Sequence, residues 1–212
     1  ENNLARSESI EKAQYLDYEI KMAWLGHPKL RIISSAENFN DKINHLIYEI
    51  EHLVSQKEIE RKWLIKNIDW DNSIEFKQST IKQYYLPTDK YDEFRIREKQ
   101  IDHYKIYYLT TKNKLPDGSR FEEEIIIDKI AFDQLLDGSI LGHIIKTRKC
   151  FLHKDRMFEL DEFENGLKIL EFETKEFDEQ IELPPWIEIE KEITNDKEYS
   201  NKNLAIKGNK FQ

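Results

Sequence analysis

The stretch "EIERKWLI", residues 58–65, decides how the rest of this sequence is interpreted. It places Glu58, Glu60 and Lys62 at every second position, and an apolar Ile59 separates the two acids. Alternate residues of a β-strand point to the same side, so a strand here carries two carboxylates and an ammonium group on one face. Surface strands often direct charge toward solvent, which leaves two alternatives. The ionic face is exposed to water, or it lines a site.

The same period of two continues through most of the chain after residue 58. Turn signals separate several of the stretches, namely "PDG" at 116–118, "DG" at 137–138 and "ENG" at 164–166. The stretches that alternate are "EFRIREK" (93–99), "YKIYYLTTK" (104–112), "RFEEEIII" (120–127), "IIKTRKCFL" (144–152), "RMFELDEF" (156–163), "LKILEFETKEF" (167–177) and "WIEIEKEIT" (186–194). Residues 128–138 and 72–78 allow short helices or irregular links. Many strands with short turns predict a mainly β (α+β) protein built on an antiparallel barrel or sandwich.

Composition excludes several classes of protein. The 212 residues are 39% hydrophobic and 12% aromatic, which is too apolar for general disorder and sufficient for one sizeable domain. The net charge of −9 argues against a nucleic-acid partner bound through bulk charge. A single cysteine, Cys150, excludes a disulfide within the chain and a CxxC metal site. No apolar run is long enough to span a bilayer and no signal-peptide core is present, so we expect a cytoplasmic protein without a membrane span.

The first 55 residues have a different pattern from the rest. Residues 9–26 place apolar side chains at helical spacing, with Gly26 and Pro28 as a plausible stop. "LRIIS" (30–34) has the composition of a short buried strand. Residues 36–54 again show helical spacing, with Ser34 or Ser35 as a candidate N-cap. We therefore predict an N-terminal helical segment, 1–55, ahead of a β domain, 56–212.

Pairs of like charges two residues apart recur on the predicted strands, so the ionic face of residues 58–65 is not isolated. Outward-facing charge over an apolar core remains the simpler interpretation of any single strand. The pairs are Arg95 and Arg97, Glu122 and Glu124, Lys146 and Arg148, Glu159 and Asp161, and Glu171 and Glu173.

The hairpin through "ENG" allows two registers with different consequences. A two-residue Asn-Gly loop pairs Asp161 with Leu170 and puts Asp161 and Glu171 on opposite faces. A three-residue loop with Gly166 in the left-handed conformation pairs Glu159 with Glu171. Directly opposed carboxylates repel at about 4.5–5.5 Å, an arrangement that helps a divalent-cation site and not a surface hairpin. The sequence does not choose between these registers.

The arginine and lysine pairs complement such a site. Guanidinium groups match phosphate oxygens bidentately, and lysine supplies a compact point charge. If Lys62, Lys112 and the cationic pairs pointed into one cavity, acids, a metal and a polyanion would have to balance them. An ionic interior therefore indicates a site for phosphate and metal.

These motifs occur in the order found in a known family. "EIERKWLI" resembles the ExExK signature of the CYTH, or triphosphate tunnel metalloenzyme, family. The later blocks are similar to the remaining family motifs: "QYYL" (83–86), "RIR" (95–97), "YLTTK" (108–112), "RFEEEI" (120–125), "KTRK" (146–149), "FELDEF" (158–163), "LEFE" (170–173) and "KEITNDKEYSNKNLA" (191–205). The resemblance spans about residues 58–206. ExExK alone is a weak signal, and it is the ordered set that identifies the family.

The resemblance implies an eight-stranded antiparallel tunnel that binds a triphosphate with Mg²⁺ or Mn²⁺ and hydrolyses it. Lys62, Glu60 and Glu173 would be catalytic. The implied phosphate ligands are Lys62, Arg95, Arg97, Lys112, Lys146 and Arg148. The implied metal ligands are Glu58, Glu60, Glu159, Asp161, Glu171 and Glu173, and the other tunnel acids are Glu122, Glu124 and Glu192. Residues 199–201 are a candidate cap of the tunnel end or a loop. Lys149 departs from the family, which commonly has an aromatic residue there.

The N-terminal segment resembles the end of an AAA-type nucleotide-binding domain, without its P-loop. The leading hypothesis is thus a metal-dependent triphosphatase acting on tripolyphosphate, thiamine triphosphate or a nucleoside triphosphate. Adenylate cyclase chemistry in the same tunnel is an alternative. So is a regulatory module that binds polyphosphate or a phosphoinositide headgroup without catalysis. The third alternative is an interaction protein whose charged strands all face solvent.

Overall fold

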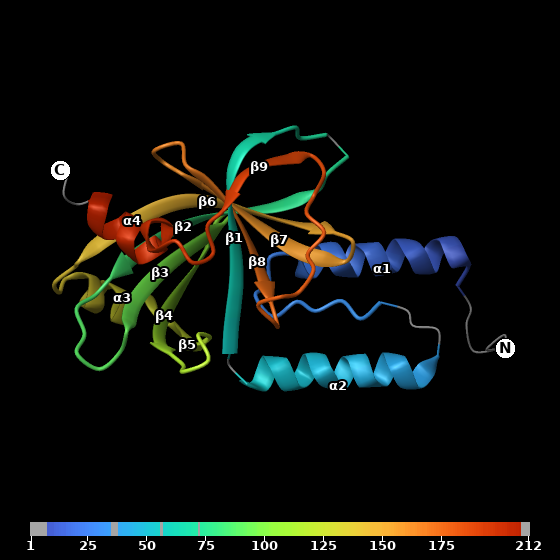
Figure 1. Cartoon of the computed structure of the whole chain (residues 1–212), viewed down its shortest axis with the longest axis horizontal. Coiled ribbons are helices and arrows are strands. Elements are labelled where there is room, and N and C mark those ends of the chain that lie inside the picture. Colours follow the sequence, from blue (N-terminus) through green and yellow to red (C-terminus); the bar gives the residue numbers. More distant parts are fainter. Residues whose placement is uncertain (1–7, 35–37, 56, 72, 209–212) are drawn as a thin grey trace.

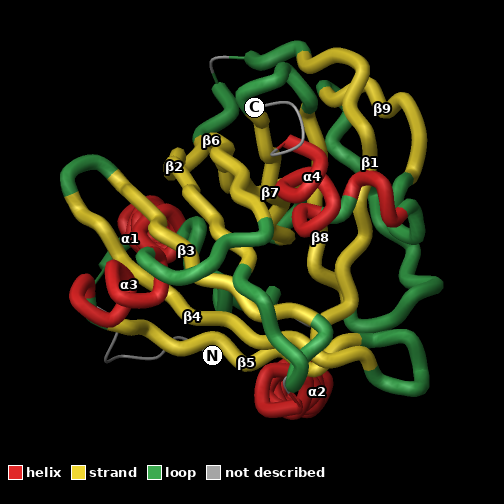
Figure 2. The backbone as a smooth tube through the Cα atoms, turned by 90° about the vertical axis from the view of Figure 1, so that its left-hand side faces the viewer, coloured by secondary structure: helices red, strands yellow, loops and turns green. Residues whose placement is uncertain are grey.

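The computed structural model describes residues 8–34, 38–55, 57–71 and 73–208, apart from the side chains of Ser55 and Glu58. Its centre is an antiparallel sheet with the strand order β5-β4-β3-β2-β6-β7-β8-β1-β9 (Figures 1 and 2). The strands are β1 (Lys57–Ile68), β2 (Phe76–Tyr85), β3 (Glu93–Ile101), β4 (Tyr104–Lys114), β5 (Arg120–Ile127), β6 (Gly142–His153), β7 (Arg156–Phe163), β8 (Lys168–Thr174) and β9 (Ile187–Glu192). The predicted antiparallel β architecture is confirmed, with nine strands in the described residues where eight were expected.

The ends of the sheet curl toward each other. Besides its ladders with β8 and β9, β1 pairs with β5 at Lys57–Phe121 and Glu58–Arg120. This contact joins only two residue pairs, so the ring of β1–β8 meets at one end of β1 and is not closed along the rest of that strand. The additional strand, β9, pairs with the second half of β1, on the side where β5 has left it.

The apolar faces of the strands pack outside the ring. The largest cluster contains Trp63, Phe151, Phe158 and Leu170, and Trp186 packs against it from the stretch that leads into β9. These residues alternate with the charged positions, so the core lies on one face of the sheet and the charges on the other. A second cluster around Ile169, with Leu64, Ile144 and Ala205, lies beside α4 (Asn201–Gly208) at one end of the ring.

The helices flank the ring. α3 (Lys129–Leu136), which the sequence left as helix or irregular link, is N-capped by Asp128 and packs Phe132 against the outside of β3 and β4. α1 (Ile10–Trp24) and α2 (Phe39–Ser55) both lie at the end opposite α3 and α4, apart from each other (Figure 1). No helix in the described residues is both long and apolar enough to cross a membrane.

Two expectations for the N-terminal segment are wrong in detail. Residues 30–34 form no strand. The cap of α2 is Asn38, whose side chain accepts the amide hydrogen of Asp41 at 2.9 Å, while Ser34 instead bonds Asp155; Ser35 lies outside the described residues. The apolar faces of α1 and α2 are largely exposed, and α2 instead turns Glu49 toward the strands, where its carboxylate pairs with Lys175.

Gly142 lets α4 approach the ring, because a Cβ atom there would overlap the Ala205 carbonyl group. We expect Gly142→Ala to displace α4 and lower the free energy of unfolding by about 1–3 kcal/mol, as overpacking does elsewhere. Urea unfolding measures this. Gly208→Ala, in the same helix with open space around it, is the matched control and should shift stability by less than about 0.5 kcal/mol. Equal effects of both variants would contradict this packing role.

Candidate active site

The ionic faces of the strands point into the ring. They line a cavity of about 510 Å³ that extends from the α4 end to the N-terminal segment. Of the residues selected from sequence, it is lined by Glu60, Lys62, Arg95, Arg97, Lys112, Glu122, Glu124, Lys146, Arg148, Glu159, Glu171 and Glu173. The charged face of residues 58–65 therefore belongs to a site, and the solvent-facing alternative is wrong for the described side chains of this set.

Two pairs of acids stand opposite each other across neighbouring strands. The hairpin between β7 and β8 uses the three-residue loop: Gly166 has a φ of 85°, and the Phe163 amide donates to the Leu167 carbonyl at 2.9 Å. Glu159 consequently pairs with Glu171 in the ladder. Between β1 and β8, Glu60 is opposite Glu173. Of the two registers left open by the sequence, the structure has the one that concentrates carboxylates on the inner face.

Buried cations balance these acids on one wall of the tunnel. Asp161, which is fully buried, accepts hydrogen bonds from Arg148 Nε at 2.7 Å and Nη2 at 2.6 Å, and it also pairs with Lys146. Arg148 reaches Glu171 at 2.5 Å and contacts Glu159. One guanidinium group thus connects three carboxylates on two strands, β7 and β8.

Two opposing effects set the pKa values of the charged side chains in this wall: burial disfavours the charged forms, and ion pairs favour them. Burial disfavours the charged form of Glu171, but Lys62, Lys146 and Arg148 outweigh it and hold the pKa of Glu171 well below its usual range. Burial likewise works against the charged form of Lys62, yet Glu171 and Glu60 raise its pKa above that of an ordinary lysine. For Lys146 burial wins over Asp161, and its pKa is lowered.

A second ionic wall is formed by β3, β4 and β5. Arg97 donates to both carboxylate oxygens of Glu124, at 2.8 and 2.7 Å, and Thr110 donates to one of them at 2.8 Å. Arg95 pairs with Glu122 at 3.5 Å, and Lys112 pairs with the same carboxylate at 2.5 Å. Cations thus line both sides of one cavity, which suits a linear polyanion lying between them.

Two of the residues selected from sequence are placed differently, and a third is not tested. Glu192 does not line the cavity: its carboxylate forms a two-point ion pair with Arg61, at 2.9 and 2.7 Å, on the outer face of β1. Asp161 lies behind the wall and acts through Lys146 and Arg148. The side chain of Glu58 lies outside the described residues, so its role as a ligand stays a prediction.

Sequence reasoning missed several residues of the cavity. Gln83 and Tyr85 of β2 are buried, line the cavity and bond each other. Their spacing of two within the motif "QYYL" was an available signal. Most residues of 194–203, from the end of β9 into the first turn of α4, also line it, and of these only the 199–201 stretch was named from sequence, as a candidate cap. Arg31, which lines the neighbouring cavity and donates to Glu173 of this one at 2.8 Å, gave no sequence signal, since it lies far from any motif.

The donor set has the chemistry that Mg²⁺ or Mn²⁺ requires. Glu60, Glu159, Glu171 and Glu173 offer hard carboxylate oxygens to one cavity. In the structure these carboxylates face cations of the protein, and no three acidic, imidazole or thiol groups among the described residues are gathered as a metal centre. The residues fit a divalent cation in type, provided that Lys62 and Arg148 take other partners when it binds. Arg31 bonds one carboxylate oxygen of Glu173, Oε1.

The fold and the cavity together define a class of protein, an antiparallel β-tunnel with an ionic interior. No family model matches the chain. The chain is 34% identical to an inorganic triphosphatase of Nitrosomonas europaea over 157 residues, which are 70% of this chain and 97% of that protein. The chain therefore belongs to the CYTH-like family of tunnel proteins of which that enzyme is a member.

Solved structures were also found. The inorganic triphosphatase NE1496 aligns with 31% identity and a TM-score of 0.48, over 70% of this chain and 94% of that one. The PH1819 protein of Pyrococcus horikoshii OT3 aligns with 26% identity and a TM-score of 0.44, over 57% and 80%. The curated relative is matched almost whole, while a substantial part of this chain has no counterpart in it.

Asp161→Asn should destabilise the protein strongly, because it leaves Lys146 and Arg148 buried beside a neutral group. We expect a loss of about 3–5 kcal/mol in the free energy of unfolding. Glu162→Gln is the control one residue away, since Glu162 pairs with Lys149 and Lys168 on the outer face at 3.2 and 3.7 Å, and it should cost at most about 1 kcal/mol. Denaturant unfolding of both variants measures the difference in the free energy of unfolding. Similar losses would contradict the idea that Asp161 is needed to neutralise the buried cations.

Glu171 makes acid stability depend on pH in a definite direction. Its pKa is depressed in the folded state, so its contribution to stability is present above the ordinary value of 4.5 and is lost as pH falls from there toward the folded pKa. The stability difference between the wild type and Glu171→Gln should therefore shrink as pH is lowered through this window. Unfolding at a series of pH values measures it. A difference that stays constant on acidification would mean that Glu171 is not held ionised by its cationic neighbours.

Proposed function

We propose that this protein is a metal-dependent phosphohydrolase that cleaves a linear triphosphate inside the tunnel, with inorganic tripolyphosphate as the leading substrate. The observation that carries the proposal is one cavity with cations on both sides and opposed carboxylates at one end. The activity of the family member from Nitrosomonas europaea, an inorganic triphosphatase, supports it. The requirement for Mg²⁺ or Mn²⁺ and a cytoplasmic location are parts of the proposal.

The two walls divide the work of binding. Arg95, Arg97 and Lys112 would hold phosphate oxygens from one side, and Lys62, Lys146 and Arg148 from the other. Each of these cations has an acidic neighbour in the structure, so binding exchanges a carboxylate for a phosphate oxygen. Because Lys62 is kept charged by Glu60 and Glu171, it is available to neutralise the charge that develops on the phosphoryl oxygens.

The chemical step is attack of water on the terminal phosphorus, with cleavage of the bond to the bridging oxygen and release of orthophosphate and pyrophosphate. A divalent cation held by Glu60 and Glu173, with Glu159 or Glu171, would supply charge neutralisation at the phosphoryl oxygens. Glu60 and Glu173 lie beside each other across β1 and β8, and Glu173 is bonded by Arg31 of the N-terminal segment. We assign these two the role of orienting the reacting end of the substrate.

Phosphate release from tripolyphosphate, ATP and thiamine triphosphate, with Mg²⁺, Mn²⁺ or chelator, tests the proposal. We expect release from tripolyphosphate only with metal, and a fall of at least about 100-fold in Glu60→Gln, since an orienting ligand is lost. Glu188→Gln removes a carboxylate that pairs with Lys66 on the exterior and should leave the rate unchanged.

Two other outcomes have clear meanings. Tight binding of tripolyphosphate without release from any substrate would favour the binding module over the enzyme. Neither binding nor release would contradict a phosphate site in this tunnel.

A further inference from the structure

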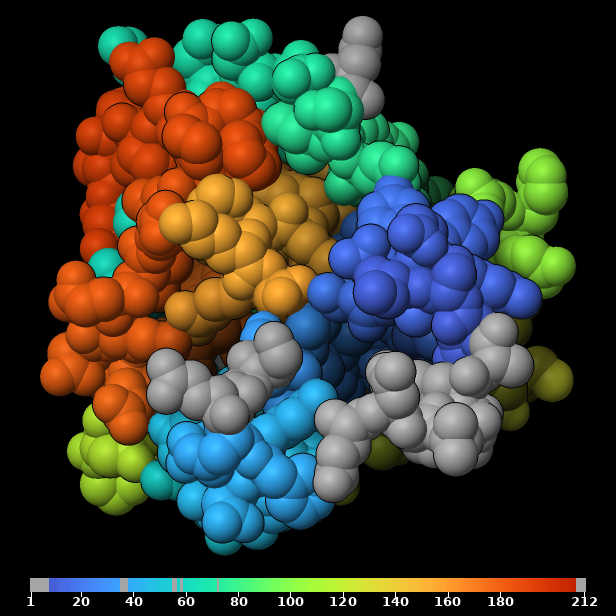
Figure 3. Space-filling view, turned by 90° about the vertical axis from the view of Figure 1, so that its right-hand side faces the viewer, coloured from blue at the N-terminus to red at the C-terminus, as the bar shows by residue number. Residues whose placement is uncertain are grey.

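The connection between α1 and α2 covers one end of the tunnel. Residues 25–34 run across the end where Glu60 and Glu173 lie, and Pro28 is part of the cavity wall itself. Figure 3 shows this end of the molecule, with the N-terminal residues in blue shades beside the gold β6–β7 turn. The opposite end of the cavity is lined by polar residues of the 194–203 stretch. The two ends of the tunnel are thus built differently.

The first anchor of this segment is Gly26. Its carbonyl accepts a hydrogen bond of 3.0 Å from Lys99 of β3, and its Cα faces the side chain of Cys150 of β6. A Cβ atom placed on Gly26 would lie 3.6 Å from the Cβ of Cys150. Cys150 is only 2% exposed. The chain therefore closes directly onto inward-facing residues of two tunnel strands.

The second anchor is Arg31. Its guanidinium group donates to Glu173 of β8 at 2.8 Å and lies 3.7 Å from Glu49 of α2. Outside the tunnel, Lys21 and Ser34 both bond Asp155 in the β6–β7 turn, at 2.8 and 3.2 Å. The segment is thus tied to β3, β6, β8 and the β6–β7 turn, which surround this end.

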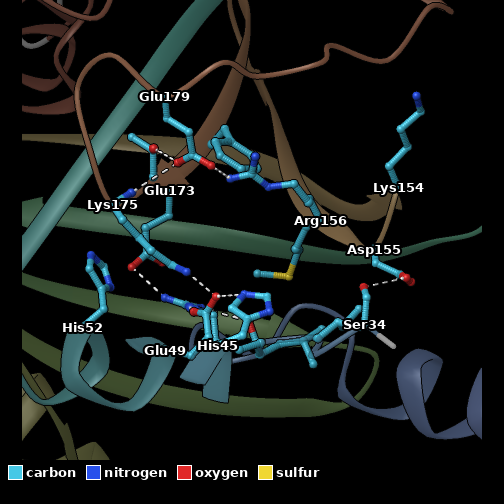
Figure 4. A pocket seen from close by; sticks show the side chains of 16 residues that line it. Ser34, His45, Glu49, His52, Lys154, Asp155, Arg156, Glu173, Lys175 and Glu179 are labelled. Carbon is cyan, nitrogen blue, oxygen red and sulfur yellow. Dashed lines mark hydrogen bonds and ion pairs between the residues drawn. The ribbon is translucent and has the colours of Figure 1, made fainter. Parts of the chain in front are cut away.

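Behind the segment lies a second cavity of about 350 Å³, which shares Met157, Phe172 and Glu173 with the tunnel (Figure 4). Its charged side chains already have partners within the protein. Arg156 pairs with Glu179 at 2.5 Å, Lys175 with Glu49, and Lys154 with Glu182. Glu49 and Glu179 add negative charge to the lining.

We propose that residues 26–34 are a fixed stopper, so that the tunnel is blind and a substrate has to enter with a free terminal phosphate leading. This proposal rests on the proposed function and adds a rule for the substrate. The reacting end lies against the Glu60–Glu173 end, and an ester group or the remainder of a longer chain stays at the α4 end. Linear tripolyphosphate and mono-esterified triphosphates satisfy this rule. Internal segments of a long polyphosphate do not, because they would have to pass through the stopper.

A disulfide lock distinguishes a fixed stopper from a gate. Cys150 is the only cysteine, and the Cβ separation of 3.6 Å to a residue at position 26 suits a disulfide. Gly26→Cys, once oxidised, should keep the tripolyphosphatase rate of its own reduced form within about twofold, a difference of less than ~0.5 kcal/mol in the barrier. Loss of activity on oxidation, restored by dithiothreitol, would overturn the proposal. Gly26→Ser controls for the left-handed backbone at this position (φ +84°).

The products from long-chain polyphosphate test the rule itself. The wild type should shorten chains only from their ends, releasing small phosphates while the remaining chains stay long on a gel. Arg31→Glu places a carboxylate against Glu173 and Glu49 and should displace the stopper. Fragments of intermediate length should then appear. Arg31→Lys, which keeps the positive charge, should behave like the wild type and produce no such fragments. Intermediate fragments from the wild type at early times would overturn the proposal.

A readout without catalysis separates this proposal from the proposed function. Cys150 lies directly under Gly26, so its reaction with a maleimide in the native protein reports whether the stopper is in place. We expect slow labelling in the wild type and at least tenfold faster labelling in Arg31→Glu, equivalent to ~1.4 kcal/mol in the opening equilibrium. Fast labelling of the wild type would refute a fixed stopper even if hydrolysis is observed. Slow labelling without hydrolysis of any substrate would leave the stopper standing and refute the triphosphatase.

Discussion

The ion pair between Asp161 and its two cations, Lys146 and Arg148, is the interaction on which the rest of the tunnel depends. All three groups are buried, and they can be buried only together. Once Arg148 is held from behind by Asp161, its remaining edge reaches Glu171, and Glu171 in turn holds Lys62. A chain of opposite charges thus passes from β7 through β6 and β8 to β1. It fixes the direction of each functional group before any ligand is present.

Such an interior is a costly way to build a stable protein. Apolar residues of similar volume often serve stability as well as buried ion pairs do, because desolvation offsets much of the attraction. Here stability comes from elsewhere, namely the apolar clusters outside the ring and at the α4 end. The division frees the inner face for charge. The inner cations are balanced by carboxylates of the protein itself, which, under the proposed function, phosphate oxygens would replace.

Much of this was open to sequence reasoning. The alternation of charged and apolar residues gave the strands and their inner faces, because the period of a strand is a local property. The ordered motifs then identified the family. The β7–β8 register could not be chosen in advance, since both loops suit "ENG". In the structure Arg148 pairs with Glu159, Asp161 and Glu171, and only the three-residue loop puts these acids on one face. Glu192 was misplaced because Arg61, on the outer face of the neighbouring strand β1, offers it a two-point ion pair. The contacts of Arg31 and Gly26 with the tunnel could not be predicted, because they join parts of the chain more than 70 residues apart.

The central claim is that the inner cations exchange their carboxylates for phosphate oxygens. Calorimetric titration of tripolyphosphate in the presence of a chelator tests it most directly, in the wild type, Arg97→Gln and Lys105→Gln. Arg97 faces Glu124 inside the tunnel, and Lys105 pairs with Glu98 on the outer face. The account predicts one bound tripolyphosphate per chain, at least tenfold weaker binding in Arg97→Gln (~1.4 kcal/mol), and no change in Lys105→Gln. Equal binding by all three proteins would place the phosphate outside the tunnel and contradict the account.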